Sequence, residues 1–207
     1  AVDVASVKDI ITPELKAAGN RLVLLTVKRD GDLLPDYEDL KAQYRALTED
    51  IKAKRVLSAY VLERHGAAEA VTKMALGNGL GVKLADSVSE ETLFAPGWCN
   101  LLLEVPAEAL GKLSCRTELF GEVTATPVLS YRGTEISLAE AEKAWTGTLE
   151  EVFPTRVTEG GEILDRPLYH AASVAVCGHK IGMPRVFIPV FPGTNCEYDS
   201  ARAFEEV

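Results

Sequence analysis

The sequence predicts an α/β protein in which helices cover a mixed, layered sheet, and three observations support this class. An apolar run over residues 22–27 lies between a Gly-Asn pair and an Asp-Gly-Asp turn, as expected of a buried strand. Apolar side chains recur every three or four residues over 37–51, which is typical of an amphipathic helix. Further strands and helices follow without a regular strand-helix alternation, so a layered mixed sheet is favoured.

The first helix is expected to begin after Pro35, with Asp36 as its cap. Residues 56–62 should continue or restart it. One face of the helix carries its apolar side chains, namely Tyr37, Leu40, Tyr44, Leu47 and Ile51.

A second amphipathic helix is expected after His65 and Gly66, and Gly77-Asn78-Gly79 should end it because both residue types tolerate the left-handed conformation. Pro154 should stop a closing helix with apolar residues at helical spacing. The apolar side chains of the second helix are Ala67, Ala70, Val71, Met74 and Ala75. Those of the closing helix are Leu138, Ala141, Trp145, Leu149 and Val152. The remaining strands are expected at 81–84, 100–105, 118–124, 127–131 and 134–136, with Arg132-Gly133 as the turn that leads into the last of them.

The sequence divides into three parts. We expect a complete α/β domain over 1–153, a linker rich in Pro and Gly over 154–184, and the truncated start of another domain over 185–207. The last part contains a strand-like stretch at 185–191, a turn over 192–195 and a helix start near Asp199. One strand and one helical turn cannot bury a core, so this second domain is incomplete.

Composition excludes several classes of protein. The net charge is 22 − 31 = −9 and is spread along the chain, which argues against a nucleic-acid partner. No apolar run approaches the roughly 18 residues that span a bilayer, and no signal peptide is recognisable, so we expect no membrane association and a cytoplasmic location. The four cysteines form no Cys-x-x-Cys pair, and neither a zinc site nor a disulfide framework is indicated.

Residues 190–199, Val-Phe-Pro-Gly-Thr-Asn-Cys-Glu-Tyr-Asp, resemble the opening strand, loop and helix of the glutaminase domain in phosphoribosylformylglycinamidine synthases. Residues 73–81 and 120–123 resemble the C-terminal domain that the synthetase half of that enzyme shares with aminoimidazole ribonucleotide synthetase. Trp145 and residues 152–155 are similar to the junction in large single-chain forms. The resemblance covers nearly the whole chain, although His65-Gly66-Ala67 stands where many members have Asp-Gly-Gly.

The resemblance implies a ligase of purine biosynthesis that uses ATP, magnesium and glutamine. ATP would activate the amide oxygen of formylglycinamide ribonucleotide, and ammonia released from glutamine would displace the phosphate to leave an amidine. The remaining synthetase domains and the glutaminase domain would be the partners of this chain, which alone should hydrolyse neither ATP nor glutamine. The glutaminase nucleophile would lie beyond Val207, so no catalytic residue is expected here, and Cys196 is interpreted as a packing residue.

The candidate site is the start of the second helix. The residues predicted to bind a substrate or nucleotide phosphate are His65, Gly66 and Ala67. Gly66, Ala67 and Ala68 would present free backbone N–H groups, and His65 and Gly66 would face the cleft. The alternative, in which His65 only caps the helix, stays open. The glycines over 77–81 follow a helix C-terminus, where the dipole repels phosphate, so we interpret them as a helix stop.

Two other identities stay open. The chain could be the C-terminal domain of a sibling ATP-dependent synthetase, although such enzymes have no glutaminase joined at 185–199. It could instead be a non-catalytic interaction module that dimerises through its sheet.

Overall fold

The computed structural model describes residues 4–32, 34–154, 170, 172–173, 176, 178–179, 181–183 and 185–206. The chain divides into two compact units, Ala1–Val157 and Thr158–Val207. Most of the expected linker, 154–184, lies outside the described residues. Within the described residues, no helix combines the length and the apolar character needed to cross a membrane.

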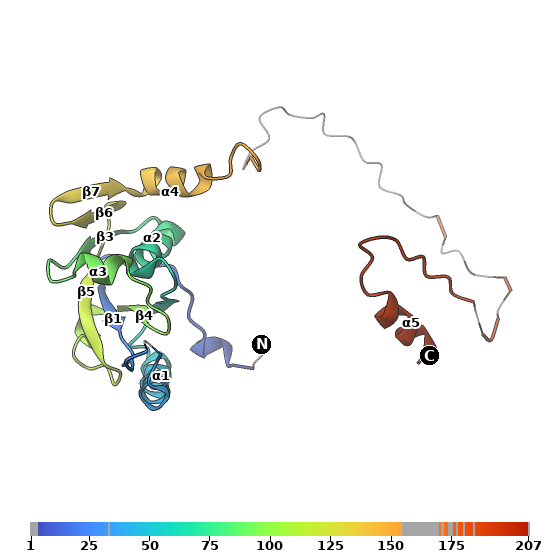
Figure 1. Ribbon diagram of the computed structural model, residues 1–207, viewed down its shortest axis with the longest axis horizontal. Coiled ribbons are helices and arrows are strands. Elements are labelled where there is room, and N and C mark those ends of the chain that lie inside the picture. The colour runs from blue at the N-terminus through green and yellow to red at the C-terminus, as the bar shows by residue number, and fades with distance from the viewer. Residues whose placement is uncertain are drawn as a thin grey trace. The chain divides into compact units, whose positions relative to one another are not determined.

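The first unit contains a seven-stranded mixed sheet with the order β2-β4-β1-β5-β3-β6-β7 (Figure 1). Neighbouring strands are antiparallel except β3 and β6, which are parallel. The strands are β1 Arg21–Leu25, β2 Ser58–Val61, β3 Gly81–Leu84, β4 Leu101–Val105, β5 Thr117–Thr124, β6 Val128–Tyr131 and β7 Thr134–Ser137. The α-helices of this unit are α1 Tyr37–Lys52, α2 Gly66–Asn78, α3 Glu90–Phe94 and α4 Leu138–Gly147, with short 3-10 turns at Val7–Asp9 and Ala107–Ala109.

Alternate residues of β1 face two separate cores. Leu22 and Leu24 pack in the cluster that contains Met74 of α2, whereas Val23 and Leu25 pack with Leu47 of α1. The two-residue period of a strand therefore buries both faces of β1, which explains its uninterrupted apolar sequence. The expected layered α/β fold class is confirmed, with α2 and α3 on one face of the sheet and α1 on the other.

Helix α1 begins where the sequence predicted. The Asp36 side chain accepts hydrogen bonds from the backbone N–H groups of Glu38 and Asp39. The expected continuation over 56–62 is wrong, because Lys54 adopts φ 59° just after the helix and the chain then forms the edge strand β2, paired with β4. Pairing with a distant strand overrides the local helical pattern there.

Helix α2 ends as expected, with Gly79 in the left-handed conformation at its C-cap. Helix α3 was not anticipated. Ser89 caps it by accepting a hydrogen bond from the Thr92 backbone N–H. The sequence predicted only a connection between the strands expected at 81–84 and 100–105.

The predicted turn at Arg132 and Gly133 joins β6 to β7, and both residues have positive φ. Ser137 and Glu140 then form a reciprocal capping box that starts α4. This helix ends at Gly147, earlier than the apolar spacing predicted. Leu149 lies beyond its end and is exposed.

The second unit differs in part from its prediction. Helix α5, Glu197–Glu205, begins two residues before the expected start at Asp199. Gly193 has φ 90°, and the Thr194 backbone N–H donates to the Phe191 carbonyl, which confirms the turn. The expected strand at 185–191 is not formed, because its backbone has no ladder with another described strand and Pro189 has no N–H to donate.

A buried carboxylate joins the N-terminal segment to the sheet. The side chain of Glu104 on β4 is fully buried. It accepts hydrogen bonds from the backbone N–H groups of Lys16 and Ala17, from Asn20 Nδ2 at 2.7 Å and from Ser58 Oγ at 2.8 Å. Four donor groups therefore compensate the cost of removing this charge from water.

We predict that Glu104→Gln lowers the free energy of unfolding by about 3 kcal/mol, since an amide N–H₂ would face donors that the carboxylate now satisfies. Urea denaturation followed by circular dichroism measures this change. Glu122→Gln is the matched control in the same sheet, because its half-exposed ion pair with Arg21 is worth less than about 1 kcal/mol. Equal losses in the two variants would contradict the prediction.

A second buried carboxylate fixes the C-terminal end of α1. Asp50 is fully buried and accepts hydrogen bonds from Arg55 Nε and from the backbone N–H groups of Ser114 and Cys115. Burial, the largest single influence, acts to raise the pKa of Asp50, but these hydrogen bonds together outweigh it and the pKa is lowered. The ionised form of Asp50 therefore stabilises the fold.

A group with a lowered folded pKa contributes stability above its unfolded pKa and loses it as the pH falls toward the folded pKa. The ordinary value for Asp50 is 3.8. We therefore predict that Asp50→Asn costs about 2 kcal/mol at pH 7 and progressively less below about pH 4. Urea midpoints at a series of pH values test this, and a constant difference from pH 7 to pH 3 would contradict it.

Candidate functional site

A hollow of about 480 Å³ lies along the exposed side of the first turns of α2. Three elements contribute to it, because α3 and α4 both approach α2 there. The lining residues are His65, Ala68, Glu69, Thr72, Lys73, Phe94 and Trp145. This is the hollow that contains the predicted site residue His65.

The three predicted site residues have different surroundings. His65 is exposed at the N-cap position, and its side chain makes no capping hydrogen bond. Gly66 and Ala67 are buried, and a methyl group added at Gly66 would lie 2.6 Å from the carbonyl oxygens of both Leu93 and Ala95. Gly66 also has φ 69°, so glycine is required at this close approach. The first turn of α2 thus packs under the end of α3 with His65 exposed beside it, and phosphate binding at these residues stays a prediction.

An ion pair on α2 lines the hollow. Lys73 Nζ lies 2.6 Å from Glu69 Oε1, one helical turn away, and both side chains are partly buried. The hydrogen bond with Lys73 lowers the pKa of Glu69, and the same bond raises the pKa of Lys73. Both groups are therefore charged at neutral pH, and an anionic ligand would compete with Glu69 for the ammonium group.

The ammonium group of Lys73 also faces two aromatic rings. Its Nζ lies 5.8 Å from the ring centroid of Tyr60 and 5.7 Å from that of Trp145. Such cation–π contacts contribute about 0.5–1 kcal/mol at exposed sites. Lys73 therefore connects β2, α2 and α4 at one point.

Sequence reasoning did not single out Glu69 and Lys73 as candidate site residues. Their spacing of four residues is the helix ion-pair spacing and could have indicated the pair. Trp145 was interpreted as part of an apolar helix face, but 58% of its surface is exposed. Its contact with Lys73 depends on the position of α4, which no local pattern encodes.

The arrangement is suited to binding rather than to covalent catalysis. The imidazole of His65 and the ammonium of Lys73 can contact anionic oxygens, and the exposed ring of Trp145 can stack on a planar group. The described part of the chain holds no group of three or more His, Cys, Asp or Glu side chains that could bind a metal ion.

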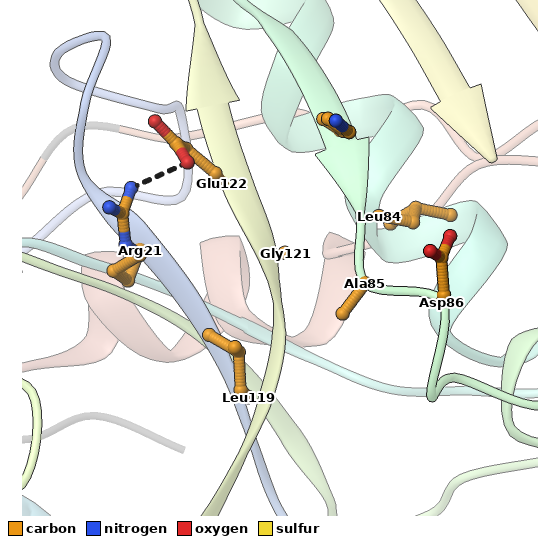
Figure 2. A pocket seen from close by; sticks show the side chains of 8 residues that line it. Arg21, Leu84, Ala85, Asp86, Leu119, Gly121 and Glu122 are labelled. Atoms are coloured by element: carbon orange, nitrogen blue, oxygen red, sulfur yellow. Dashed lines mark ion pairs between the residues drawn. The ribbon is translucent and has the colours of Figure 1, made fainter. Parts of the chain in front are cut away.

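Figure 2 shows a second hollow, of about 370 Å³, on the opposite face of the sheet. Arg21 of β1 points toward Glu122 of β5, and their charged atoms lie 2.9 Å apart. A polar row crosses five strands in register, namely Arg21, Glu122, Lys83, Ser130 and Glu135. Alternating charges of this kind are typical of a hydrated sheet face, so we do not assign a reaction to this hollow.

Two of the cysteines that the structure describes lie in different surroundings. Cys196 is exposed and adopts φ 75° just before α5, so its interpretation as a buried packing residue is wrong. Cys115 is buried, and burial raises the pKa of its thiol to about 12. Cys115 is thus protonated at neutral pH, and a thiol is not a nucleophile in that form.

No family model matches the sequence. Among solved structures, phosphoribosylformylglycinamidine synthase II from Thermotoga maritima matches with a TM-score of 0.53 and 17% identity over 62% of this chain and 27% of that chain. T. maritima PurL complexed with FGAR matches with 0.55 and 17%, covering 64% and 29%. PurLQS from Thermotoga maritima matches with 0.56 and 15%, covering 65% and 28%.

At these identities the likeness shows the fold alone. The mixed sheet with its helices is the arrangement found in these synthetase structures. This chain spans less than a third of the length of each of the three matched chains.

The contact between Lys73 and Trp145 can be tested by fluorescence. In a Trp98→Phe background, Lys73→Gln should shift the emission of Trp145 to longer wavelength and lower its anisotropy, because the indole loses the cation that holds it against α2. Lys143→Gln removes the same charge from an exposed position on α4 and should leave both signals unchanged. An unaltered spectrum in Lys73→Gln would contradict the contact.

Proposed function

We propose that this chain is part of a large single-chain phosphoribosylformylglycinamidine synthase. It would supply the last synthetase domain, the connection to the glutaminase and the first residues of the glutaminase domain. The parent enzyme would convert formylglycinamide ribonucleotide, ATP and glutamine to formylglycinamidine ribonucleotide in purine biosynthesis. The chain would lack the complete glutaminase and would be inactive alone.

The likeness of its fold to phosphoribosylformylglycinamidine synthase II is the observation that carries this proposal. Related structures are complexed with ADP, ATP and FGAR, so that fold occurs in proteins that bind a nucleotide and this ribonucleotide. The sequence at 190–199 supports the glutaminase part independently, since it resembles the start of that domain and lies after the domain boundary.

The proposed reaction has two chemical steps. The amide oxygen of the ribonucleotide attacks the γ-phosphorus of ATP, and ADP leaves. Ammonia from glutamine then attacks the activated carbon, and inorganic phosphate leaves with the former amide oxygen, which produces the amidine. Such phosphoryl transfer depends mainly on positioning and on electrostatic stabilisation of charge.

The role of this chain would be to form one wall of the substrate cleft. His65 and Lys73 are placed to contact anionic oxygens, but Glu69 already neutralises Lys73, so these residues alone do not form a triphosphate site. The remaining phosphate contacts and the groups that hold magnesium would come from the other synthetase domains. Magnesium would neutralise charge on the phosphates when bound.

We predict that His65→Ala, made in the full parent protein, raises the KM for ATP or for the ribonucleotide about threefold to tenfold, the effect of losing one hydrogen bond of ordinary net strength. Production of ADP with the ribonucleotide and glutamine present measures this. His170→Ala replaces another exposed histidine, in the second unit, and should change neither constant.

Two results separate the site from the function. Unchanged KM values for both substrates in His65→Ala would remove His65 from the cleft. A parent protein that forms no formylglycinamidine ribonucleotide from the three substrates would overturn the proposed function itself, as would turnover of glutamine by the isolated chain.

A further inference from the structure

An apolar cavity of about 420 Å³ lies between α2, α3 and the hairpin formed by β6 and β7. These elements are neighbours in Figure 1. The side chains of Val71, Leu84 and Leu93 form its buried part. The cavity adjoins the hollow around Lys73, with which it shares Ala68, Thr72 and Phe94, but its lining is mostly apolar.

The cavity exists before any ligand binds, because the hairpin that closes one side of it is held in place. The Tyr131 hydroxyl donates to the Val88 carbonyl at 2.6 Å, and the Arg132 guanidinium donates to the carbonyls of Asp86 and Val88. Leu129 also pairs with Val82 of β3 in the sheet. A preformed pocket saves the ordering cost that a flexible site would add to binding.

Large apolar side chains remain in contact with water at this cavity. Ile136 is 48% exposed and Phe94 is 65% exposed, although both line it. A ligand that covers them removes apolar surface from water, which favours binding by about 25 cal/mol per Å² of that surface. The volume is within the range of about 300–1,000 Å³ typical of small-molecule sites.

One charged group determines what kind of molecule fits. Glu90 is the only Asp, Glu, Lys, Arg or His among the described residues that line the cavity. No ion pair of the described residues includes it. Its exposed carboxylate is therefore available to a cation at the rim, next to an apolar interior.

We propose that this cavity is a binding site for a small apolar amine, with the hydrocarbon or aromatic part against Val71, Leu129 and Ile136 and the protonated nitrogen at Glu90. The apolar lining selects the body of the ligand, and charge complementarity with Glu90 selects its polar end. This site is separate from the proposed ligase reaction and does not depend on it.

The test uses the whole 207-residue chain and two probes of matched shape, 1-naphthylmethylamine and the uncharged 1-naphthalenemethanol. Both should shift the backbone NMR signals of Leu129 and Ile136. The amine should bind about threefold to fivefold more tightly at low salt, which is the size of an exposed ion pair, and this preference should disappear near 1 M salt.

Two neighbouring glutamates provide the matched comparison. Glu90→Gln should remove the preference for the amine, whereas Glu91→Gln, one residue along α3 and outside the lining, should retain it. Ile136→Ser at the mouth should weaken both probes by a similar factor, with circular dichroism confirming that the variant is folded.

Three outcomes would overturn the proposal. The probes could leave the signals of the cavity residues unshifted, or the two probes could bind the unmodified chain equally at low salt. Alternatively, the chain could sediment as a dimer that excludes both probes until Ile136→Ser dissociates it, and a second copy would then be the occupant.

Discussion

The buried carboxylate of Glu104 is the interaction on which the arrangement of the first unit depends. Its four donor groups belong to the N-terminal segment and to β2, so one side chain joins both of these to β4. The segment in turn bonds to α2 through the Leu15 N–H and the Met74 carbonyl, and to β5 through Gly19 and Val123. Moving this carboxylate out of the core would leave four donor groups without an acceptor. Glu104 therefore fixes the N-terminal segment, and through it the position of α2 relative to the sheet.

Helix α2 carries most of the charged side chains that line the candidate site. Its start is held by the close approach of Gly66 to the carbonyl groups at the end of α3. Its exposed side presents Glu69 and Lys73, and Lys73 reaches the Trp145 ring. The candidate site is therefore a product of packing among three helices, and none of them forms it alone.

Two hollows of different chemistry meet along this helix. The first contains an ion pair, an imidazole and an indole, whereas the second is apolar with a single carboxylate at its rim. Ala68 and Thr72 line both, and the small side chain of Ala68 leaves space on either side. One helix can in this way line both a charged hollow and an apolar pocket, because its faces meet different neighbours.

The amino-acid sequence by itself determined the features that depend on near neighbours along the chain. The Asp36 cap of α1, the glycine stop after α2, the Arg132-Gly133 turn and the layered α/β class were all predicted and are all present. Caps, turns and apolar periodicity act over only a few residues, and this short range makes them recognisable without the fold.

Tertiary structure decided the features that need a distant partner. Residues 58–61 form a strand because β4 offers them a hydrogen-bonding edge, whereas 185–191 have no such edge and form none. The contact of Lys73 with Trp145 joins positions 72 residues apart in the chain, and three of the four donor groups of Glu104 come from 84 or more residues away. Local sequence patterns contain no information about which distant groups will meet, since packing of the whole domain sets those distances.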